Sequence, residues 1–505
     1  MAKTRLFWYH LPMAREQTVA KNTLFLTAGS ICQKLLAFVY FTILARHFLP
    51  PDDVGRYLYA LSYAALFSVI VDFGVQPVLI RAIAKDRSRA RTIISNAIGI
   101  KTVFAIITAA AMFWAARVTE SDPVKIALIS VACITLVLDS VQLTFYAVLR
   151  GYEKLNYEAV GVLIGQAITV TAGGVMLYLK QPLPFLMFAY VCGSAWNAIY
   201  SWRMAKRVTN ERFSISLDRS VWKEILVMAL PFAAAAIFVR IYSSADSVLL
   251  NRLAGNAAAA FYGVPYKFVF AFQFVPIALA AALFPTYSRE AGQGKARLGE
   301  LFWNAERYLM LVALPLVAGM VSLAHPLIVT FYKSQYLPSV PIMMILAWCL
   351  IPAFLDYPVG ALLNASHKQN IQTAFMGIIM CMSIILNLLL IPRFGAIASA
   401  CAALIGNSTL FIGGLYYAAK LADIPWKKLL ASFARIGGSA LVMALVVILT
   451  QGHLKLYFSV ALGIAVYMLG LFVTRELGRS DIMRFRDILR PPRPETDVTE
   501  SEITV

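Results

Sequence analysis

Long apolar stretches alternate with short polar ones from about residue 19 to residue 474. Many of the apolar stretches reach about 20 residues, the length at which a helix crosses the hydrocarbon core of a bilayer. Helices are expected because backbone groups inside a membrane must satisfy one another. The pattern predicts an all-α polytopic membrane protein with fourteen transmembrane helices, at 19–45, 55–80, 92–116, 124–149, 156–179, 184–205, 224–250, 257–286, 301–331, 338–363, 369–391, 396–419, 427–450 and 455–474.

The connections between these spans differ in charge. Numbered alternately, those on one side of the membrane hold roughly three times as many Lys and Arg as those on the other, and the basic side is the cytoplasmic one. Both termini are therefore predicted in the cytoplasm, in a multi-pass protein of the cytoplasmic (inner) membrane. The net charge of +19 follows mainly from this topology. Anionic lipid head groups are the expected neighbours of the basic loops, and nucleic acid is not an expected partner.

The spans form a repeat of six and six. "LARHFLPPDDVGRYLYALSY" (44–63) resembles "LLNRLAGNAAAAFYGVPYKF" (249–268), and "VLRGYEKLNYEAV" (148–160) resembles "LLNASHKQNIQTA" (362–374). Each pair occupies corresponding positions in spans one to six and seven to twelve. Because both repeats enter the membrane in the same direction, we predict two lobes related by a pseudo-twofold axis along the membrane normal, with a binding site between them.

The repeat defines the predicted domain organisation. A cytoplasmic segment (1–18) precedes an N-lobe (19–208), a cytoplasmic linker (209–223) and a C-lobe (224–420). Spans thirteen and fourteen (421–476) have no counterpart in the repeat, and they either pack on the rim or extend a lipid-facing groove. The tail (477–505) is expected to hold an amphipathic helix on the inner leaflet or to be solvated, and to end in a disordered segment.

Signals of enzyme chemistry are missing from the sequence. The segment "GQGKAR" (292–297) contains a Gly-Lys pair but lacks the earlier glycine and the following Ser or Thr of a phosphate-binding P-loop. The six cysteines fall in apolar spans without metal-ligand spacing, and the five histidines are scattered. We expect neither an enzyme nor a bound metal or cofactor.

Two cations stand deep inside predicted spans, Lys34 in the first and Arg240 in the seventh. An ionisable group at such depth costs at least about 2.5–3.5 kcal/mol, so each is expected to face a cavity or a partner. These spans are equivalent in the repeat, which suggests a paired anion site; two interior salt bridges that pin the bundle are the alternative. With the small polar neighbours of Arg240 and a cation and aromatic group on span eight, the candidate substrate-binding residues are Arg240, Lys34, Lys267, Ser243, Ser244, Tyr266 and Gln273.

Four aspartates also lie inside predicted spans: Asp72, Asp139, Asp246 and Asp356. Asp246 is only six residues from Arg240, but six steps of about 100° place the two side chains some 120° apart around the helix. Asp246 is therefore expected to meet another helix or to titrate. Each of the four either forms an interior ion pair or binds a coupling H⁺ or Na⁺.

The sequence resembles a known family in residues 22–84. The segment "LARHFLPPDDVGRY" (44–57), and "DFG" (72–74) followed by "LIRAIA" (79–84), are similar to the opening of the polysaccharide-transporter family, which includes the Wzx-type flippases. "AFYG" (260–263) resembles the eighth span of that family. A glycine usually precedes the first proline of this connection, and Leu49 stands there instead. The superfamily also contains MATE drug exporters and MurJ-like lipid II flippases.

This resemblance implies a V-shaped, two-lobed bundle that exchanges inward-open and outward-open states. It further implies a flippase that moves undecaprenyl-diphosphate-linked oligosaccharide across the membrane for surface polysaccharide biosynthesis. A MATE-type cation-coupled antiporter, a MurJ-like lipid II flippase and a non-transporting scaffold are the alternatives. The expected partners are membrane lipids, the lipid-linked oligosaccharide and glycosyltransferases or a polymerase of the same pathway, and the expected oligomeric state is a monomer.

Overall fold

The computed structural model describes residues 26–211, 213–291 and 294–476, and this part of the chain is helical, without strands. Fourteen of its helices are long and apolar enough to cross a membrane, which confirms the predicted fold class. The elements are Leu26–His47, α2 (Pro51–Asp72), α3 (Val75–Lys85), α4 (Ala90–Thr119), α5 (Pro123–Gly151), α6 (Leu155–Tyr178), α7 (Leu183–Thr209), α8 (Arg219–Ala254), α9 (Asn256–Phe270), η1 (Ala271–Gln273), α10 (Phe274–Glu290), α11 (Lys295–Ser322), α12 (Ala324–Tyr332), η2 (Ser334–Tyr336), α13 (Ser339–Ala365), α14 (Gln369–Phe394), α15 (Ala396–Leu421), α16 (Trp426–Leu449) and α17 (Leu456–Val473).

Two predicted spans are shorter than expected. The span predicted at 55–80 is divided at Phe73 and Gly74, whose φ angles of 39° and 67° are left-handed and end α2. The span predicted at 301–331 ends at Ser322, and α12 follows as a separate short helix. The interpretations of residues 1–18 and 477–505 lie outside the described residues.

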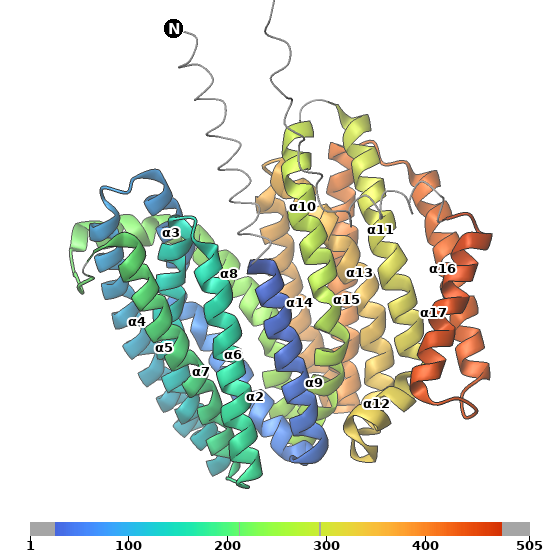
Figure 1. Cartoon of the computed structure of the whole chain (residues 1–505), viewed down its shortest axis with the longest axis horizontal. Helices are drawn as coiled ribbons and strands as arrows, with labels where there is room; N and C mark the ends of the chain where they lie inside the picture. Colours follow the sequence, from blue (N-terminus) through green and yellow to red (C-terminus); the bar gives the residue numbers. More distant parts are fainter. Residues whose placement is uncertain (1–25, 212, 292–293, 477–505) are drawn as a thin grey trace, which may run out of the picture.

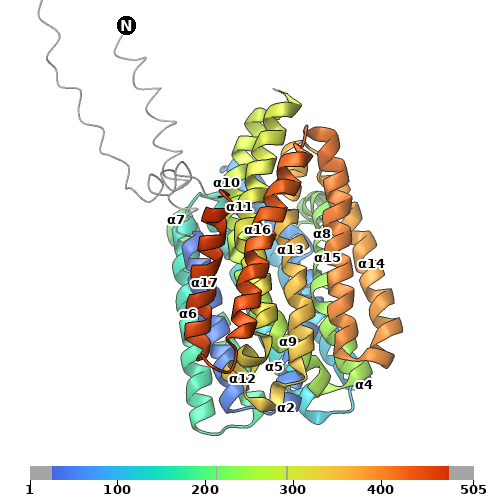
Figure 2. The ribbon, with the colours of Figure 1, turned by 90° about the vertical axis from the view of Figure 1, so that its right-hand side faces the viewer.

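The helices form two groups that lie side by side (Figure 1). We use the name N-lobe for α2–α7 and C-lobe for α9–α15, and we describe separately the first helix and α8, which the predicted lobes (19–208 and 224–420) include. Helices α16 and α17 lie at the outer edge of the second group, as Figures 1 and 2 both show. The first helix, Leu26–His47, stands between the groups.

Helix α8 packs against both lobes. Near its start, Ile225 and Ala229 belong to a buried apolar cluster with residues of α3, α4 and α5. There Gly74 of the N-lobe approaches so closely that a Cβ would lie 2.6 Å from the carbonyl oxygen of Ala229. Further along, Asp246 contacts α14 of the C-lobe. The predicted boundary at 224 assigns the whole helix to the C-lobe, whereas its first half packs on the N-lobe.

The first helix is shared in the same way. Its Tyr40 hydroxyl lies against α6 of the N-lobe, where a Cβ on Gly173 would be 2.0 Å away. Its Phe38 ring packs edge-on against Phe268 of α9 in the C-lobe, with centroids 5.6 Å apart. The opening helix of each repeat therefore connects the two lobes.

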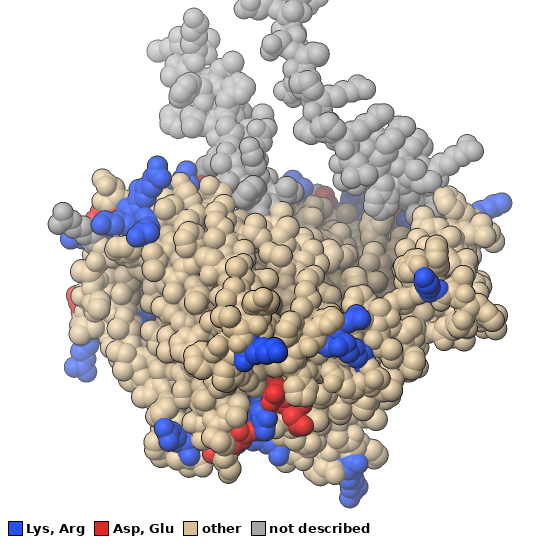
Figure 3. Space-filling view, turned by 60° about the horizontal axis from the view of Figure 1, so that its bottom comes forward, with Lys and Arg blue, Asp and Glu red and all other residues tan. Residues whose placement is uncertain are grey.

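Polar contacts join the N-lobe to the end of α8 at the end of the bundle that is lowest in Figure 1, and Asn251 of α8 donates in turn to Asn256 Oδ1 of α9 in the C-lobe at 3.1 Å. The carboxylate of Glu120, which follows α4, accepts hydrogen bonds from Arg252 of α8 at 2.9 Å and from the Tyr59 hydroxyl of α2. Lys125 of α5 donates to Asn251 of α8 at 2.5 Å. Acidic and basic side chains gather on this face in Figure 3. We call these five residues (Tyr59, Glu120, Lys125, Asn251 and Arg252) the lower clamp.

Asp122 stabilises the chain beside this clamp. It caps α5 by accepting from the Val124 N–H, and it accepts from Arg56 at 2.8 Å. Burial acts to raise the pKa of Asp122, but the hydrogen bonds from Arg56 and Val124 outweigh it, so this pKa lies below its ordinary value. The α4–α5 connection is thus held in place where the lobes meet.

Candidate functional site

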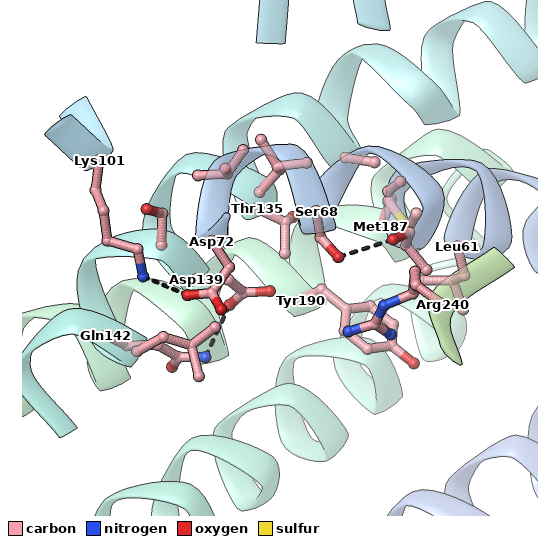
Figure 4. A pocket seen from close by; sticks show the side chains of 17 residues that line it. Leu61, Ser68, Asp72, Lys101, Thr135, Asp139, Gln142, Met187, Tyr190 and Arg240 are labelled. Atoms are coloured by element: carbon pink, nitrogen blue, oxygen red, sulfur yellow. Dashed lines mark hydrogen bonds and ion pairs between the residues drawn. The ribbon is translucent and has the colours of Figure 1, made fainter. Parts of the chain in front are cut away.

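The N-lobe contains a pocket of about 300 Å³ among α2, α4, α5 and α7, to which α8 adds one arginine (Figure 4). Its walls are mostly apolar, with Leu61, Leu136 and Met187 among them. The polar lining residues are Ser68, Asp72, Lys101, Thr135, Asp139, Ser140, Gln142, Tyr190 and Arg240.

Both carboxylates of this pocket are engaged by neighbouring side chains. Lys101 Nζ lies 2.8 Å from Asp72 Oδ1, and the Lys101 side chain is only 4% exposed. Asp139 Oδ1 accepts from Gln142 Nε2 at 3.0 Å and from Ser194 Oγ at 2.7 Å. These contacts satisfy polar groups that would be costly to bury alone.

Arg240 differs from the other charged groups of the pocket. Its side chain is exposed, and in Figure 4 it lies beside Tyr190, away from Asp72 and Lys101. No carboxylate of the described chain forms an ion pair with it. The guanidinium therefore keeps its donors available, and its planar fork suits carboxylate or phosphate oxygens.

The C-lobe contains a second pocket, of about 380 Å³, among α10, α13, α14 and α15. Its polar lining residues are Gln273, Asp356, Tyr357, Asn364, Gln372 and Asn407, and neither Lys nor Arg lines it. Asn407 Nδ2 donates to the Ala403 carbonyl at 2.8 Å. The side chains of Gln273, Asp356, Asn364 and Gln372 make no hydrogen bond to the described part of the chain, so their capacity is free.

The two predicted lysines lie along the first helix and α9. Lys267 Nζ is 4.0 Å from the centroid of the Phe41 ring, a cation–π contact between the lobes. Lys34 is exposed, forms no ion pair with the described residues, and precedes Phe41 by seven residues. Seven residues are two turns, so Lys34 shares the helix face of Phe41 at a height of about 10 Å from it.

The predicted binding residues do not form a single pocket. Arg240 lines the N-lobe pocket with Asp72 and Asp139, and Gln273 lines the C-lobe pocket with Asp356. The other predicted residues line neither: Lys34, Lys267, Ser243, Ser244 and Tyr266.

Three of those residues have local packing roles. Ser243 Oγ donates to the carbonyl of Arg240, and Ser244 is buried. The Tyr266 ring lies 4.5 Å from that of Phe270. None of these contacts points to a ligand.

Asp246 meets another helix, which is one of the two alternatives expected for it. Its Oδ1 accepts from Ser383 Oγ at 3.1 Å and from Asn387 Nδ2 at 2.9 Å, both on α14. Tyr262 donates to Oδ2 at 3.3 Å. The partners are neutral oxygen and nitrogen groups, and no described cation is paired with this carboxylate.

An apolar groove of about 430 Å³ lies where α11 and α12 meet α16 and α17. Spans thirteen and fourteen form one of its walls. It reaches Phe268, which contacts the first helix through Phe38. Its lining residues are Phe268, Phe272, Leu311, Val312, Pro315, Leu316, Gly319, Met320, Leu323, Leu327, Met443, Val447, Ser459, Val460, Gly463, Ile464 and Tyr467.

Several pocket residues were not among the sequence-predicted ones. In the N-lobe these include Lys101, Gln142 and Tyr190, and in the C-lobe they include Asn364, Gln372 and Asn407. Asn364 and Gln372 lie in "LLNASHKQNIQTA", which served only as evidence for the repeat. The sequence signal that marks Asn364 and Gln372 is an uncharged amide close to the end of a span.

Comparisons with known proteins identify the family of the chain and its fold. The family described as "Polysaccharide biosynthesis protein" matches residues 19–290, more than half of the chain, and the MatE family matches residues 231–389. An uncharacterised membrane protein of Methanocaldococcus jannaschii, MJ1068, is 24% identical over 87% of this chain and 92% of its own. The teichuronic acid biosynthesis protein TuaB of Bacillus subtilis is 28% identical over 26% of this chain and 27% of its own.

A solved structure has the same fold. The lipid II flippase MurJ, in an inward closed conformation, superimposes with a TM-score of 0.75 at 14% identity, covering 92% of this chain and all of that one. At this identity the similarity concerns the fold.

Proposed function

The chain belongs to the polysaccharide biosynthesis protein family, and from this premise we propose that it is a flippase for a polyprenyl-diphosphate-linked oligosaccharide. The observation that carries the proposal is the Arg240 guanidinium, which has no ion-pair partner among the described residues and lines a largely apolar pocket within the membrane-spanning bundle. A charge held at that depth without a partner is costly, and a ligand anion would offset the cost.

The diphosphate is the part of the substrate that Arg240 fits. Bidentate hydrogen bonds from a guanidinium to phosphate oxygens are short and strong. Lys34, on the opening helix of the other repeat, is also exposed and unpaired among the described residues, so it supplies a second positive charge. A cation exporter would instead be expected to present free carboxylates at this site, and both carboxylates of the N-lobe pocket are already bonded, so the free carboxylate of Asp356 lies in the other pocket.

The lipid part of the substrate calls for an apolar surface. The groove beside α16 and α17 supplies one next to Phe268, close to where the first helix meets the C-lobe. We propose that the polyprenyl chain occupies this groove while the head group passes between the lobes. Burial of each methylene is worth about 0.8 kcal/mol relative to water, which disfavours moving the chain through a polar path.

The lower clamp supports alternating access. It holds the lobes together at the end of the bundle opposite the basic, cytoplasmic end, so the head group enters from the cytoplasm and leaves when the clamp opens. Opening requires energy, and we propose that H⁺ or Na⁺ binding at an interior carboxylate supplies it. The candidates are Asp72, Asp139, Asp246 and Asp356.

Purified protein in liposomes tests this proposal. A fluorescent polyprenyl-diphosphate oligosaccharide should move between leaflets with wild-type protein, and Arg240→Ala at equal protein level should slow it at least tenfold. Equal rates of lipid movement for the two proteins would show that Arg240 does not bind the substrate. No movement with wild-type protein would leave the scaffold reading, in which the chain only organises glycosyltransferases or a polymerase.

A MATE-type antiporter is the second candidate, and the match of the MatE family to residues 231–389 favours it. It predicts that a deletion strain becomes sensitive to cationic drugs while its surface glycan is unchanged. Loss of glycan without drug sensitivity favours the flippase.

A further inference from the structure

We propose that the C-lobe pocket binds an uncharged sugar of the head group, while the diphosphate stays near Arg240. The inference rests on the proposed function, and it assigns to the C-lobe pocket its own class of ligand, an uncharged sugar. It assigns sugar recognition to Gln273, Asn364 and Gln372, with Asp356 as an acceptor.

The free amides carry this assignment. A side-chain amide both donates and accepts, as a sugar hydroxyl does, and Gln273, Asn364 and Gln372 make no hydrogen bond within the described chain. Polar groups in a pocket that no protein group satisfies are the ones a ligand or water must satisfy. Gly360 leaves the space for one of them, because a Cβ there would lie 2.6 Å from Gln372 Nε2.

The charge of the C-lobe pocket limits which ligands it can bind. Asp356 is its only charged lining residue, so phosphate and acidic sugars would be repelled. Neutral and N-acetylated sugars have hydroxyl and amide groups that a carboxylate and three amides can bond. The rings of Tyr357 and Phe284 add apolar faces of the kind on which sugar rings lie.

The size and position of the pocket agree with a sugar at this place. Its volume of about 380 Å³ is at the lower end of the range for small-molecule sites. The aligned repeats pair Gln142 with Asp356 and Leu143 with Tyr357, and all four residues line a pocket. The two pockets are therefore equivalent parts of the two lobes, which allows one head group to contact both.

Two lipids separate sugar binding from diphosphate binding. Purified wild-type protein and variants are titrated with farnesyl diphosphate and with the same lipid carrying one N-acetylglucosamine. Gln372→Leu and Asn364→Leu should each weaken binding of the sugar-bearing lipid roughly fivefold, the worth of about one hydrogen bond, and leave the bare lipid unchanged. Arg240→Gln should weaken both.

Gln369→Leu is the matched control on the same helix as Gln372. Gln369 is an exposed amide at the start of α14 that lines neither pocket. This variant should keep the wild-type ratio of the two affinities. An unchanged ratio in both Gln372→Leu and Asn364→Leu would overturn the sugar pocket, even if both lipids bind and the proposed function stands.

A second measurement applies if wild-type protein binds neither lipid. Asn364→Cys is made in a chain whose exposed cysteines Cys32, Cys192 and Cys381 are replaced, and its labelling by a maleimide is followed. Free glucose and N-acetylglucosamine should slow labelling, whereas glucuronate and glycerol should not. Protection would keep the sugar pocket although the lipid-linked substrate fails, and equal labelling under all four conditions would refute it.

Discussion

The pocket of the N-lobe is lined by two carboxylates, a lysine and an arginine, whereas that of the C-lobe is lined by one carboxylate and four side-chain amides. In the N-lobe the carboxylates are bonded to protein groups, whereas the guanidinium of Arg240 has no ion-pair partner among the described residues. In the C-lobe only Asn407 is bonded to another protein group, and the side chains of Gln273, Asn364, Gln372 and Asp356 make no hydrogen bond with the described residues. The two repeats thus share a backbone plan but present different chemistry to whatever lies between them.

This difference shows that counting charges does not identify a binding site. Formally the N-lobe pocket is balanced, since Lys101 and Arg240 oppose Asp72 and Asp139. Pairing decides what remains for a ligand, because a bonded charge in a low-dielectric interior has its field largely cancelled by its partner. The available groups are then one cation in the N-lobe pocket, and neutral amides with the carboxylate of Asp356 in the C-lobe pocket.

The largest expected effect comes from breaking the pairing in the N-lobe. Lys101→Met removes the ion-pair partner of Asp72. The Lys101 side chain, which the substitution replaces, is nearly buried. Removing one member of a buried pair typically costs about 3–5 kcal/mol. We expect a marked loss of folded protein, measured as a lower midpoint of thermal unfolding in detergent.

The C-lobe supplies the control for that experiment. Asp356→Asn removes a carboxylate that has no hydrogen-bond partner in the described chain, so stability should change little. The double variant Lys101→Met/Asp72→Asn should recover most of the lost stability. Equal destabilisation by Asp356→Asn and Lys101→Met would mean that pairing is not what separates the two pockets.

The next effect concerns the cation that the N-lobe leaves free. Arg240→Gln removes an exposed, unpaired charge, so we expect stability to be kept and binding of a diphosphate lipid to fall about 10- to 100-fold, the worth of a hydrogen bond to a charged group. Arg240→Lys keeps the charge but loses the fork geometry and should be intermediate. Titration with the lipid measures this. A drop in the unfolding midpoint as large as that of Lys101→Met would show that Arg240 is a structural residue instead.

The sequence predicted the membrane spans because hydropathy depends on local composition, and helix geometry argued against Arg240 as the partner of Asp246. The sequence did not predict which charged side chains pair with one another. Lys101 and Asp72 come from different helices, and their contact depends on how α2 and α4 pack. The shared role of α8 was missed for the same reason, since an apolar helix surface does not specify its neighbour.

The amides of the C-lobe were missed for another reason. An isolated Asn or Gln in a membrane span costs much less than a charge, so it does not stand out in a search for expensive residues. Gln273 was found only because it follows Lys267 on the same span. Asn364 and Gln372 lie near span ends, where polar residues are ordinary.

A smaller effect is expected from loosening the contact between the lobes. Glu120→Gln weakens the hydrogen bonds to Arg252 and Tyr59 without removing the side chain. A loss of about 1 kcal/mol shifts the equilibrium between closed and open forms of the lower clamp roughly fivefold. Spin labels at Gln181 and Gln335, exposed residues of the two lobes, should show a longer distance in a larger share of molecules.

The same labels supply the comparison between lobes. Lys333 is exposed at the same end of the bundle and has no ion-pair partner among the described residues. Lys333→Gln should therefore leave the distances between the spin labels as in wild-type protein. If Glu120→Gln also leaves them unchanged, the lower clamp does not hold the lobes together.

The smallest effect separates the two lysines between the lobes. Lys34 is exposed and unpaired among described residues, so it acts on a bound anion only through a partly screened charge, worth about 0.2–1 kcal/mol. Lys34→Gln should therefore weaken diphosphate-lipid binding by no more than about fivefold, less than Arg240→Gln does. Lys267 is committed to the Phe41 ring, so Lys267→Gln should alter the contact between the lobes, seen with the spin labels, before it alters affinity. If Lys34→Gln weakens binding as much as Arg240→Gln, the anion lies midway between the two opening helices, and the division of charge and amide between the lobes no longer describes the site.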